Sequence, residues 1–206
     1  MFTPAQIAEN YRAALEQAAR FSMGTADIQK AATRLVEALD ELGIPYAIAG
    51  GLAVAAHGHV RMTVAVDVLL TEDGLRRFKE HRLGRGWVEK FPGSRGMRDA
   101  VAGVDVDVIL TGGFPGDGKP KEVSFPDPAE AGQDVAGARV LTLDRLIELK
   151  IASGMTAPHR LQDLADVISL IRANGLEPAF SARLSPSVRD KFEELWRAAQ
   201  THDEEN

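Results

Sequence analysis

The chain has 206 residues, of which 45% are hydrophobic and 26% are charged, enough for one substantial core or one core with a helical appendage. It contains no cysteine, which excludes disulfides and thiolate metal sites, and its net charge of -6 argues against a nucleic-acid binder that relies on overall positive charge. No apolar stretch approaches the roughly 20 residues of a membrane helix, and no signal-peptide pattern opens the sequence. A cytoplasmic location and no membrane partner are therefore expected.

The spacing of apolar residues predicts helices and strands in alternation. Helical periodicity, β-branched runs and glycine stops distinguish the two kinds of element. In chain order these signals predict a helix at 4–20, a helix at 26–43, a strand at 46–49, a helix at 52–57, a strand at 63–70, a helix at 72–81, an extended segment from 87, and a hairpin of 99–101 with 104–110.

Residues 111–138 are rich in glycine and proline, which predicts a long ordered loop or a linker. This segment is either a lid, with Lys119 and Lys121 reaching phosphates, or a connector made rigid by its prolines. Beyond it the patterns predict a last strand at 140–141 and helices at 143–153, 158–174 and 187–200. The order predicts an α+β fold, divided into a core at 1–142 and a C-terminal helical part at 143–206.

Gly50 and Gly51 stand between a predicted strand and a predicted helix. Glycine lets the backbone approach a ligand closely, and free N–H groups at a helix start can hold phosphate oxygens. In the strand that follows, side-chain alternation places Thr63, Ala65 and Asp67 on one face. An aspartate in such a strand needs a partner or a metal if it is buried; otherwise it lies at a sheet edge and bonds to a loop.

A second pair of carboxylates, Asp105 and Asp107, shares one face of the strand predicted at 104–110. If that strand neighbours 63–70, both carboxylates converge with Asp67 on an oxygen-lined site. Magnesium prefers such sites, and clustered carboxylates repel one another unless a cation or a proton intervenes. The alternation therefore indicates a candidate magnesium site.

The run LGIPYAIAGGLAVAAHGHVRMTVAVDVLLT resembles the nucleotidyltransferase superfamily, in particular the bacterial AbiEii/AbiGii-type toxin nucleotidyltransferases. Members show a Gly-Gly or Gly-Ser turn, an arginine, a threonine or serine, and an Asp-x-Asp pair; the matching residues are Gly50, Gly51, Arg61, Thr63 and Asp67. The later run LTLDRLIELKIASGMTAPHRLQDLADVISLI resembles the C-terminal signature of the family. Its matching residues are Lys150, Arg160, Asp163 and Asp166.

The resemblance implies a mixed sheet flanked by helices, which binds a nucleoside triphosphate at the Gly-Gly turn. It assigns magnesium to Asp67 and Asp107, with Asp105 as a further ligand candidate, and phosphate binding to Lys150. A nucleotidyl group would pass to a hydroxyl of RNA, a protein or a small molecule, with Asp107 helping to activate that hydroxyl. The implied partners are a nucleoside triphosphate and either RNA or a cognate antitoxin-type protein. The nucleotide-binding residues that it implies are Gly50, Gly51, Arg61, Thr63, Arg160 and Asp163.

Ala65 occupies the position of the first aspartate of the Asp-x-Asp pair. Alanine cannot ligate a metal, so three explanations stand side by side. The protein is an inactive relative that binds a nucleotide or a partner, or Asp105 supplies the missing oxygen, or the aspartate has been replaced deliberately. The alternative to a transferase is thus a non-catalytic binding or regulatory protein.

Two further features have competing interpretations. The basic run at 76–98 is either a solvated face or a local phosphate-binding patch. His57 and His59 lie close to the expected site, where either would serve as a base or a phosphate contact. A histidine at the end of a short helix is more often structural.

Overall fold

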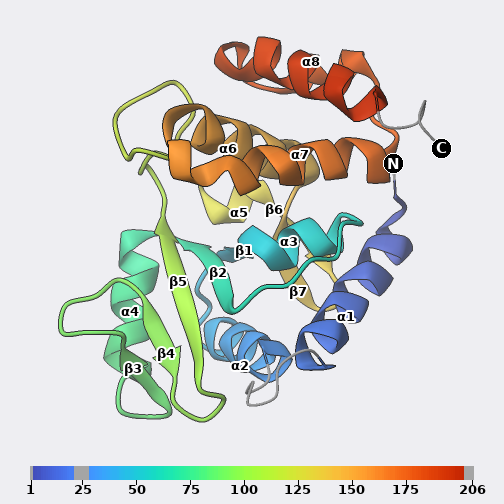
Figure 1. Cartoon of the computed structure of the whole chain (residues 1–206). Helices are drawn as coiled ribbons and strands as arrows, with labels where there is room; N and C mark the ends of the chain where they lie inside the picture. The colour runs from blue at the N-terminus through green and yellow to red at the C-terminus, as the bar shows by residue number, and fades with distance from the viewer. Residues whose placement is uncertain (1, 21–27, 202–206) are drawn as a thin grey trace.

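The computed structural model describes residues 2–20 and 28–201 (Figure 1). Two short 3-10 helices, Pro158–Arg160 and Pro178–Arg183, accompany the longer α-helices. The α-helices are α1 (Pro4–Arg20), α2 (Ile28–Glu41), α3 (Gly50–Ala56), α4 (Glu72–Arg82), α5 (Pro128–Ala131), α6 (Leu143–Thr156), α7 (Leu161–Asn174) and α8 (Pro186–Gln200). The strands are β1 (Tyr46–Ile48), β2 (Ala65–Leu70), β3 (Trp87–Glu89), β4 (Met97–Asp99), β5 (Val104–Leu110), β6 (Gly132–Val135) and β7 (Ala138–Leu141).

The strands form one seven-stranded mixed sheet in the order β3-β4-β5-β2-β1-β7-β6. Its centre is the parallel pair β2 and β5, and β1 joins β2 in antiparallel and β7 in parallel orientation. Strands β3, β4 and β5 form an antiparallel meander at one edge. The expectation of an α+β fold with a mixed sheet flanked by helices is confirmed.

Local sequence explains where the elements near the site begin and end. Helix α4 begins after Thr71, whose hydroxyl accepts a hydrogen bond from the amide of Gly74 at 3.0 Å. Glu72 and Asp73 in the first turn complement the helix dipole. Helix α2 ends where Gly43 takes a positive φ of 58°, a conformation that glycine adopts without strain. Gly43 thus lies in the short connection from α2 to β1, and Thr71 lies in the connection from β2 to α4.

Helices α6, α7 and α8 pack on one another at the top of Figure 1, and α2 lies at the opposite side of the sheet. One continuous hydrophobic core contains residues from both halves of the chain, from Ile7 to Ala199. The division at residue 142, which we expected from the sequence, therefore runs through a shared core. Within the described ranges, no helix is both long and apolar enough to cross a lipid bilayer.

The structure differs from the sequence-based expectation mainly at element boundaries. Strand β2 begins at Ala65, where its pairing with β5 starts opposite Asp105, and the Thr63 hydroxyl donates to the carbonyl of Ala65 at 3.1 Å. The segment predicted as a loop at 111–138 contains α5 and β6, and α5 starts where the Asp127 side chain accepts from the amide of Ala129. Residues 26 and 27 of the predicted second helix lie outside the described residues.

Candidate functional site

The candidate site begins with the carboxylates on the central strands. In the parallel register of β2 and β5, Asp67 lies beside Asp107, and Ala65 lies beside Asp105. Since alternate residues of a strand face the same way, all four side chains belong to one face of the sheet. The predicted convergence of Asp67 and Asp107 is therefore present as a cross-strand pair.

Gly50 and Gly51 lie against the start of this carboxylate row. Gly50 has φ of 55°, and a Cβ there would stand 1.9 Å from the Asp67 carboxylate oxygen Oδ2. A Cβ on Gly51 would stand 2.9 Å from the Thr63 side chain. Both glycines are thus required by the close approach of α3 to Asp67 and Thr63. This contact links the two motifs that the sequence analysis singled out.

Asp105 and Asp107 form ion pairs with two side chains of the basic run at 76–98, Lys90 and Arg98. The Lys90 ammonium lies 2.9 Å from Asp107 Oδ1 and 3.1 Å from Asp105 Oδ2. Arg98 donates from Nη1 to Asp105 Oδ1 at 2.7 Å. Partial desolvation tends to raise the pKa of Asp105, but the hydrogen bonds from Lys90 and Arg98 outweigh it and hold that pKa below its ordinary value.

A second charged cluster ties α6 to α7. The Lys150 ammonium lies 2.7 Å from Asp163 Oδ1 and 2.7 Å from Asp166 Oδ2. Ser153 donates to the other oxygen of Asp163 at 2.7 Å. Burial alone would raise the pKa of Asp166, but Lys150 and then the other donors lower it below its ordinary value. Lys150, Asp163 and Asp166, which the sequence grouped as one signature, are therefore in direct contact.

Arg61 connects this cluster to the segment that precedes β2. Its Nε lies 2.9 Å from Asp166 Oδ1, and its Nη2 donates to Asp166 Oδ2 at 3.1 Å. The Asp166 side chain is fully buried, so two cations compensate one carboxylate that has left water. Arg61 thus ties the segment before β2 to α7, and neither Arg61 nor Thr63 lines the cavity between the sheet and α6.

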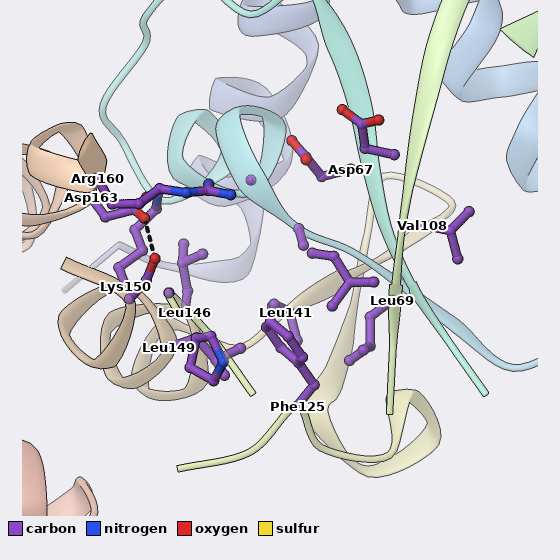
Figure 2. A pocket seen from close by; sticks show the side chains of 17 residues that line it. Asp67, Leu69, Val108, Phe125, Leu141, Leu146, Leu149, Lys150, Arg160 and Asp163 are labelled. Atoms are coloured by element: carbon purple, nitrogen blue, oxygen red, sulfur yellow. Dashed lines mark hydrogen bonds and ion pairs between the residues drawn. The ribbon is translucent and has the colours of Figure 1, made fainter. Parts of the chain in front are cut away.

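A cavity of about 500 Å³ opens between the sheet and α6. Its polar lining consists of Asp67, Asp107, Lys150, Ser153, Arg160 and Asp163. Its apolar lining includes Leu69, Phe125, Leu141, Leu146 and Leu149. Figure 2 shows Asp67 and Arg160 on one side of the cavity and Leu141, Leu149 and Phe125 on the other. A volume of this size, apolar with a few convergent polar groups, is typical of a small-molecule site.

The electrostatics of the cavity favour a bound cation near Asp67. Burial raises the pKa of Asp67 above its ordinary value, and the neighbouring Asp107 raises it further. Lys150, Arg61 and Arg160 lower that pKa without overcoming the other two causes. No described side chain makes an ion pair with Asp67. A positive charge supplied by a ligand would therefore stabilise the ionised form.

The residues fit magnesium as a pair of carboxylates. Magnesium is commonly held by one or two carboxylates together with substrate phosphates, which Asp67 and Asp107 can supply. Across the described residues, no group of three or more His, Cys, Asp or Glu side chains is placed to hold a metal ion. The three-carboxylate arrangement of Asp67, Asp105 and Asp107 is not assembled, because Lys90 and Arg98 bind both oxygens of Asp105.

The loop between β5 and α5 is held against α6. Lys121 donates to the Pro115 carbonyl at 2.6 Å and to the Thr156 hydroxyl at 3.1 Å, and a Cβ on Gly116 would stand 2.1 Å from that hydroxyl. Lys121 therefore serves as an anchor, whereas Pro115 and Gly116 form part of the cavity lining. This arrangement agrees with the rigid-connector interpretation.

Most of the basic run is also paired within the protein. Arg76 binds Asp73 and Glu80, Lys79 binds Glu89, and the remaining contacts include Arg77 with the Leu42 carbonyl and Arg82 with Glu41. His57 is buried and its Nε2 hydrogen-bonds the Leu141 carbonyl at 2.8 Å. Both features support the structural interpretations over the phosphate-binding ones.

Comparisons with known proteins give a limited result. No protein-family model matches the sequence, and no curated protein matches it. Among solved structures, the crystal structure of ANT(2")-Ia in complex with adenylyl-2"-tobramycin aligns with a TM-score of 0.48 and 16% identity, over 83% of this chain and 95% of that chain. The solution structure of the antibiotic-resistance factor ANT(2'')-Ia aligns with a TM-score of 0.46 and 17% identity, over 85% and 100%. Similarity at this level leaves the function to be argued from the residues of the cavity.

Proposed function

We propose that the cavity binds a nucleoside triphosphate with magnesium, and that the protein transfers a nucleotidyl group to a hydroxyl. The observation that carries the proposal is the pair Asp67 and Asp107, which lie side by side in register, with Asp67 directly against Gly50. Arg160 lines the same cavity, on the side of Asp67, and supplies positive charge there. An acidic pair and a cation that line one cavity suit a phosphate group that arrives with a divalent ion.

The residues would divide the work between metal and phosphate. Asp67 and Asp107 would hold magnesium, which neutralises charge on phosphate oxygens when it is bound. Arg160 would contact a phosphate, because it forms no ion pair with an acidic side chain among the described residues. Lys150 has two partners at 2.7 Å, which leaves one of its three ammonium protons for the ligand. Gly50, which lines the cavity, would act through its close approach to Asp67, and Gly51 through its approach to Thr63.

In the transfer step, the acceptor oxygen forms a bond to the α-phosphorus as the bond from that phosphorus to the bridging oxygen breaks. Pyrophosphate leaves, and the hydroxyl proton passes to the Asp107 carboxylate. Asp163 would keep Lys150 in place during this step through the contact at 2.7 Å. Arg61 and Thr63 would act indirectly, by fixing the segment that leads into β2.

The apolar half of the cavity favours a small-molecule acceptor among the three classes that the resemblance implies. Leu69, Phe125, Leu141, Leu146 and Leu149 form that half. An RNA strand would bring phosphates, which are costly to desolvate, against these side chains. A cytoplasmic location, where nucleoside triphosphates are available, belongs to the same proposal.

Ala65 favours a second candidate function, nucleotide binding without turnover. Asp105 lies beside Ala65, but its two oxygens are bound by Lys90 and Arg98 and do not replace the missing ligand. A site with two carboxylates in place of three would bind the nucleotide while stabilising the transition state poorly. The protein would then act as a regulatory or partner-binding module.

An assay for label transfer separates the two candidates. The protein would be incubated with magnesium and each of the four α-labelled nucleoside triphosphates, together with a panel of hydroxyl compounds, and pyrophosphate release would be measured. Release that disappears in Asp67→Asn but persists in Asp134→Asn, a control at an exposed position on β6, supports transfer. Nucleotide binding without release, with release gained in Ala65→Asp, supports the binding function. No nucleotide binding in either protein contradicts both.

A further inference from the structure

We propose that the Lys90 ammonium is a tethered counter-ion for the carboxylate row, and that it competes with a divalent ion for Asp107. The inference rests on the proposed function, because it concerns the same pair of metal-binding carboxylates. It adds a residue that limits divalent-ion affinity and that the nucleotidyltransferase resemblance does not include.

The position of the ammonium carries the first step of the argument. Lys90 Nζ lies 2.9 Å from Asp107 Oδ1 and 3.1 Å from Asp105 Oδ2, so a single charge bridges two carboxylates that are neighbours on one face of β5. A divalent ion bound between Asp67 and Asp107 would share the Asp107 carboxylate with the Lys90 ammonium, which already holds its Oδ1. Two cations at one carboxylate repel each other, so the ion and the ammonium compete.

The path of the Lys90 side chain is prepared by the neighbouring strand. The Lys90 amide donates to the Gly96 carbonyl at 3.2 Å, which places Gly96 between Lys90 and β5. A Cβ on Gly96 would stand 2.7 Å from Lys90 Cδ and 3.5 Å from the Val106 carbonyl. Because Gly96 has no side chain, the aliphatic part of Lys90 can pass over this position and reach the carboxylates on β5.

The charges of the row explain why this contact matters in this chain. Asp67, Asp105 and Asp107 contribute three negative charges, and Lys90 and Arg98 contribute two positive ones. Ala65 removes the carboxylate that would otherwise stand beside Asp105. The protein's own cations thus neutralise most of the row, and only Asp67 has no ion pair with a described side chain. A divalent ion would then bind weakly until the Lys90 contact is broken.

The experiment measures Mn²⁺ binding to the nucleotide-free protein by electron paramagnetic resonance. Lys90→Met should tighten Mn²⁺ binding by about two- to fivefold, since one competing ion pair is removed. Gly96→Ala should also tighten it, because the new methyl displaces the lysine stem while every charge is kept. Arg98→Met is the matched control: it removes one charge from Asp105 but leaves the Lys90 contact to Asp107 intact.

The outcomes separate this inference from the proposed function. Tighter binding in Lys90→Met and Gly96→Ala, with a smaller change in Arg98→Met, supports the competition. If Lys90→Met binds Mn²⁺ with the same affinity as the parent, the competition is wrong. An equal gain in Mn²⁺ affinity in Arg98→Met and Lys90→Met also overturns it, because that gain would reflect net charge alone. If no variant binds Mn²⁺, including the double variant Ala65→Asp with Lys90→Met, the proposed metal site itself is wrong.

Discussion

The contact between Gly50 and Asp67 leads to a quantitative prediction. Gly50→Ala forces a side chain into a backbone with φ of 55° and places its Cβ 1.9 Å from Asp67 Oδ2. The backbone conformation alone costs an ordinary residue about 1 to 2 kcal/mol. Displacing the Asp67 carboxylate adds an overpacking cost of about 1 to 3 kcal/mol. The expected loss in the free energy of unfolding is therefore about 2 to 5 kcal/mol from these two sources.

Gly175→Ala isolates the first of these costs. Gly175 has the same φ of 55°, but a Cβ there meets nothing within 4 Å. This control should lose only the backbone cost, about 1 to 2 kcal/mol. The difference between the two variants measures the collision with Asp67.

The assay is urea denaturation of four proteins that form a double-mutant cycle: the parent, Gly50→Ala, Asp67→Ala and the variant with both changes. We expect Gly50→Ala to cost less in the Asp67→Ala background, because the carboxylate at 1.9 Å is then absent and only the Cβ contact at 2.8 Å remains. Additive effects across the cycle, or equal losses in Gly50→Ala and Gly175→Ala, would refute the close approach of α3 to Asp67.

Three further predictions concern the charged and buried groups. Folding raises the pKa of Asp67, so the stability that the protonated Asp67 side chain contributes is lost as the pH rises through the folded pKa. Asp67→Asn should therefore stabilise the protein more at pH 7 than at pH 4, as measured by urea denaturation. Lys150→Met removes the described cation beside Asp163 and one of the two beside the fully buried Asp166, which keeps Arg61. It should cost about 3 kcal/mol of unfolding free energy, the lower end for a broken buried pair, and a loss below about 1 kcal/mol would contradict this. Burial lowers the pKa of His57, so stability should fall as the pH drops below about 6.5, and His57→Gln should flatten that dependence in thermal denaturation at several pH values.

The sequence predicted those parts of the fold that depend on local patterns. Alternating valines in residues 104–110 and apolar spacing in 143–153 and 187–200 gave elements that the structure contains. The start of β2 differs from the expected residue 63, because pairing with β5 begins at Ala65 and depends on a strand far along the chain. Helix α5 and strand β6 were missed, because a segment rich in glycine and proline has little local periodicity to indicate them.

The candidate site was predictable as a set of residue types but not as a set of contacts. Alternation placed Asp105 and Asp107 on one face, yet only the register of β2 and β5 brings Asp107 beside Asp67. The cation between the carboxylates, Lys90, comes from a meander whose pairing no local signal specified. Gly96 did not reveal this contact in the sequence, because its closeness to the Lys90 side chain depends on the pairing of β3, β4 and β5.

Isothermal titration calorimetry of ATP, GTP, CTP and UTP, with and without magnesium, tests the central claim most directly. The titrations would compare the parent protein with Asp67→Asn and Ala65→Asp. The account predicts that at least one nucleotide binds the parent only when magnesium is present, that Asp67→Asn loses this binding, and that Ala65→Asp strengthens it. Binding that ignores magnesium and Asp67, or no binding to the parent or to Ala65→Asp, would contradict a nucleotide site at the Asp67 and Asp107 pair.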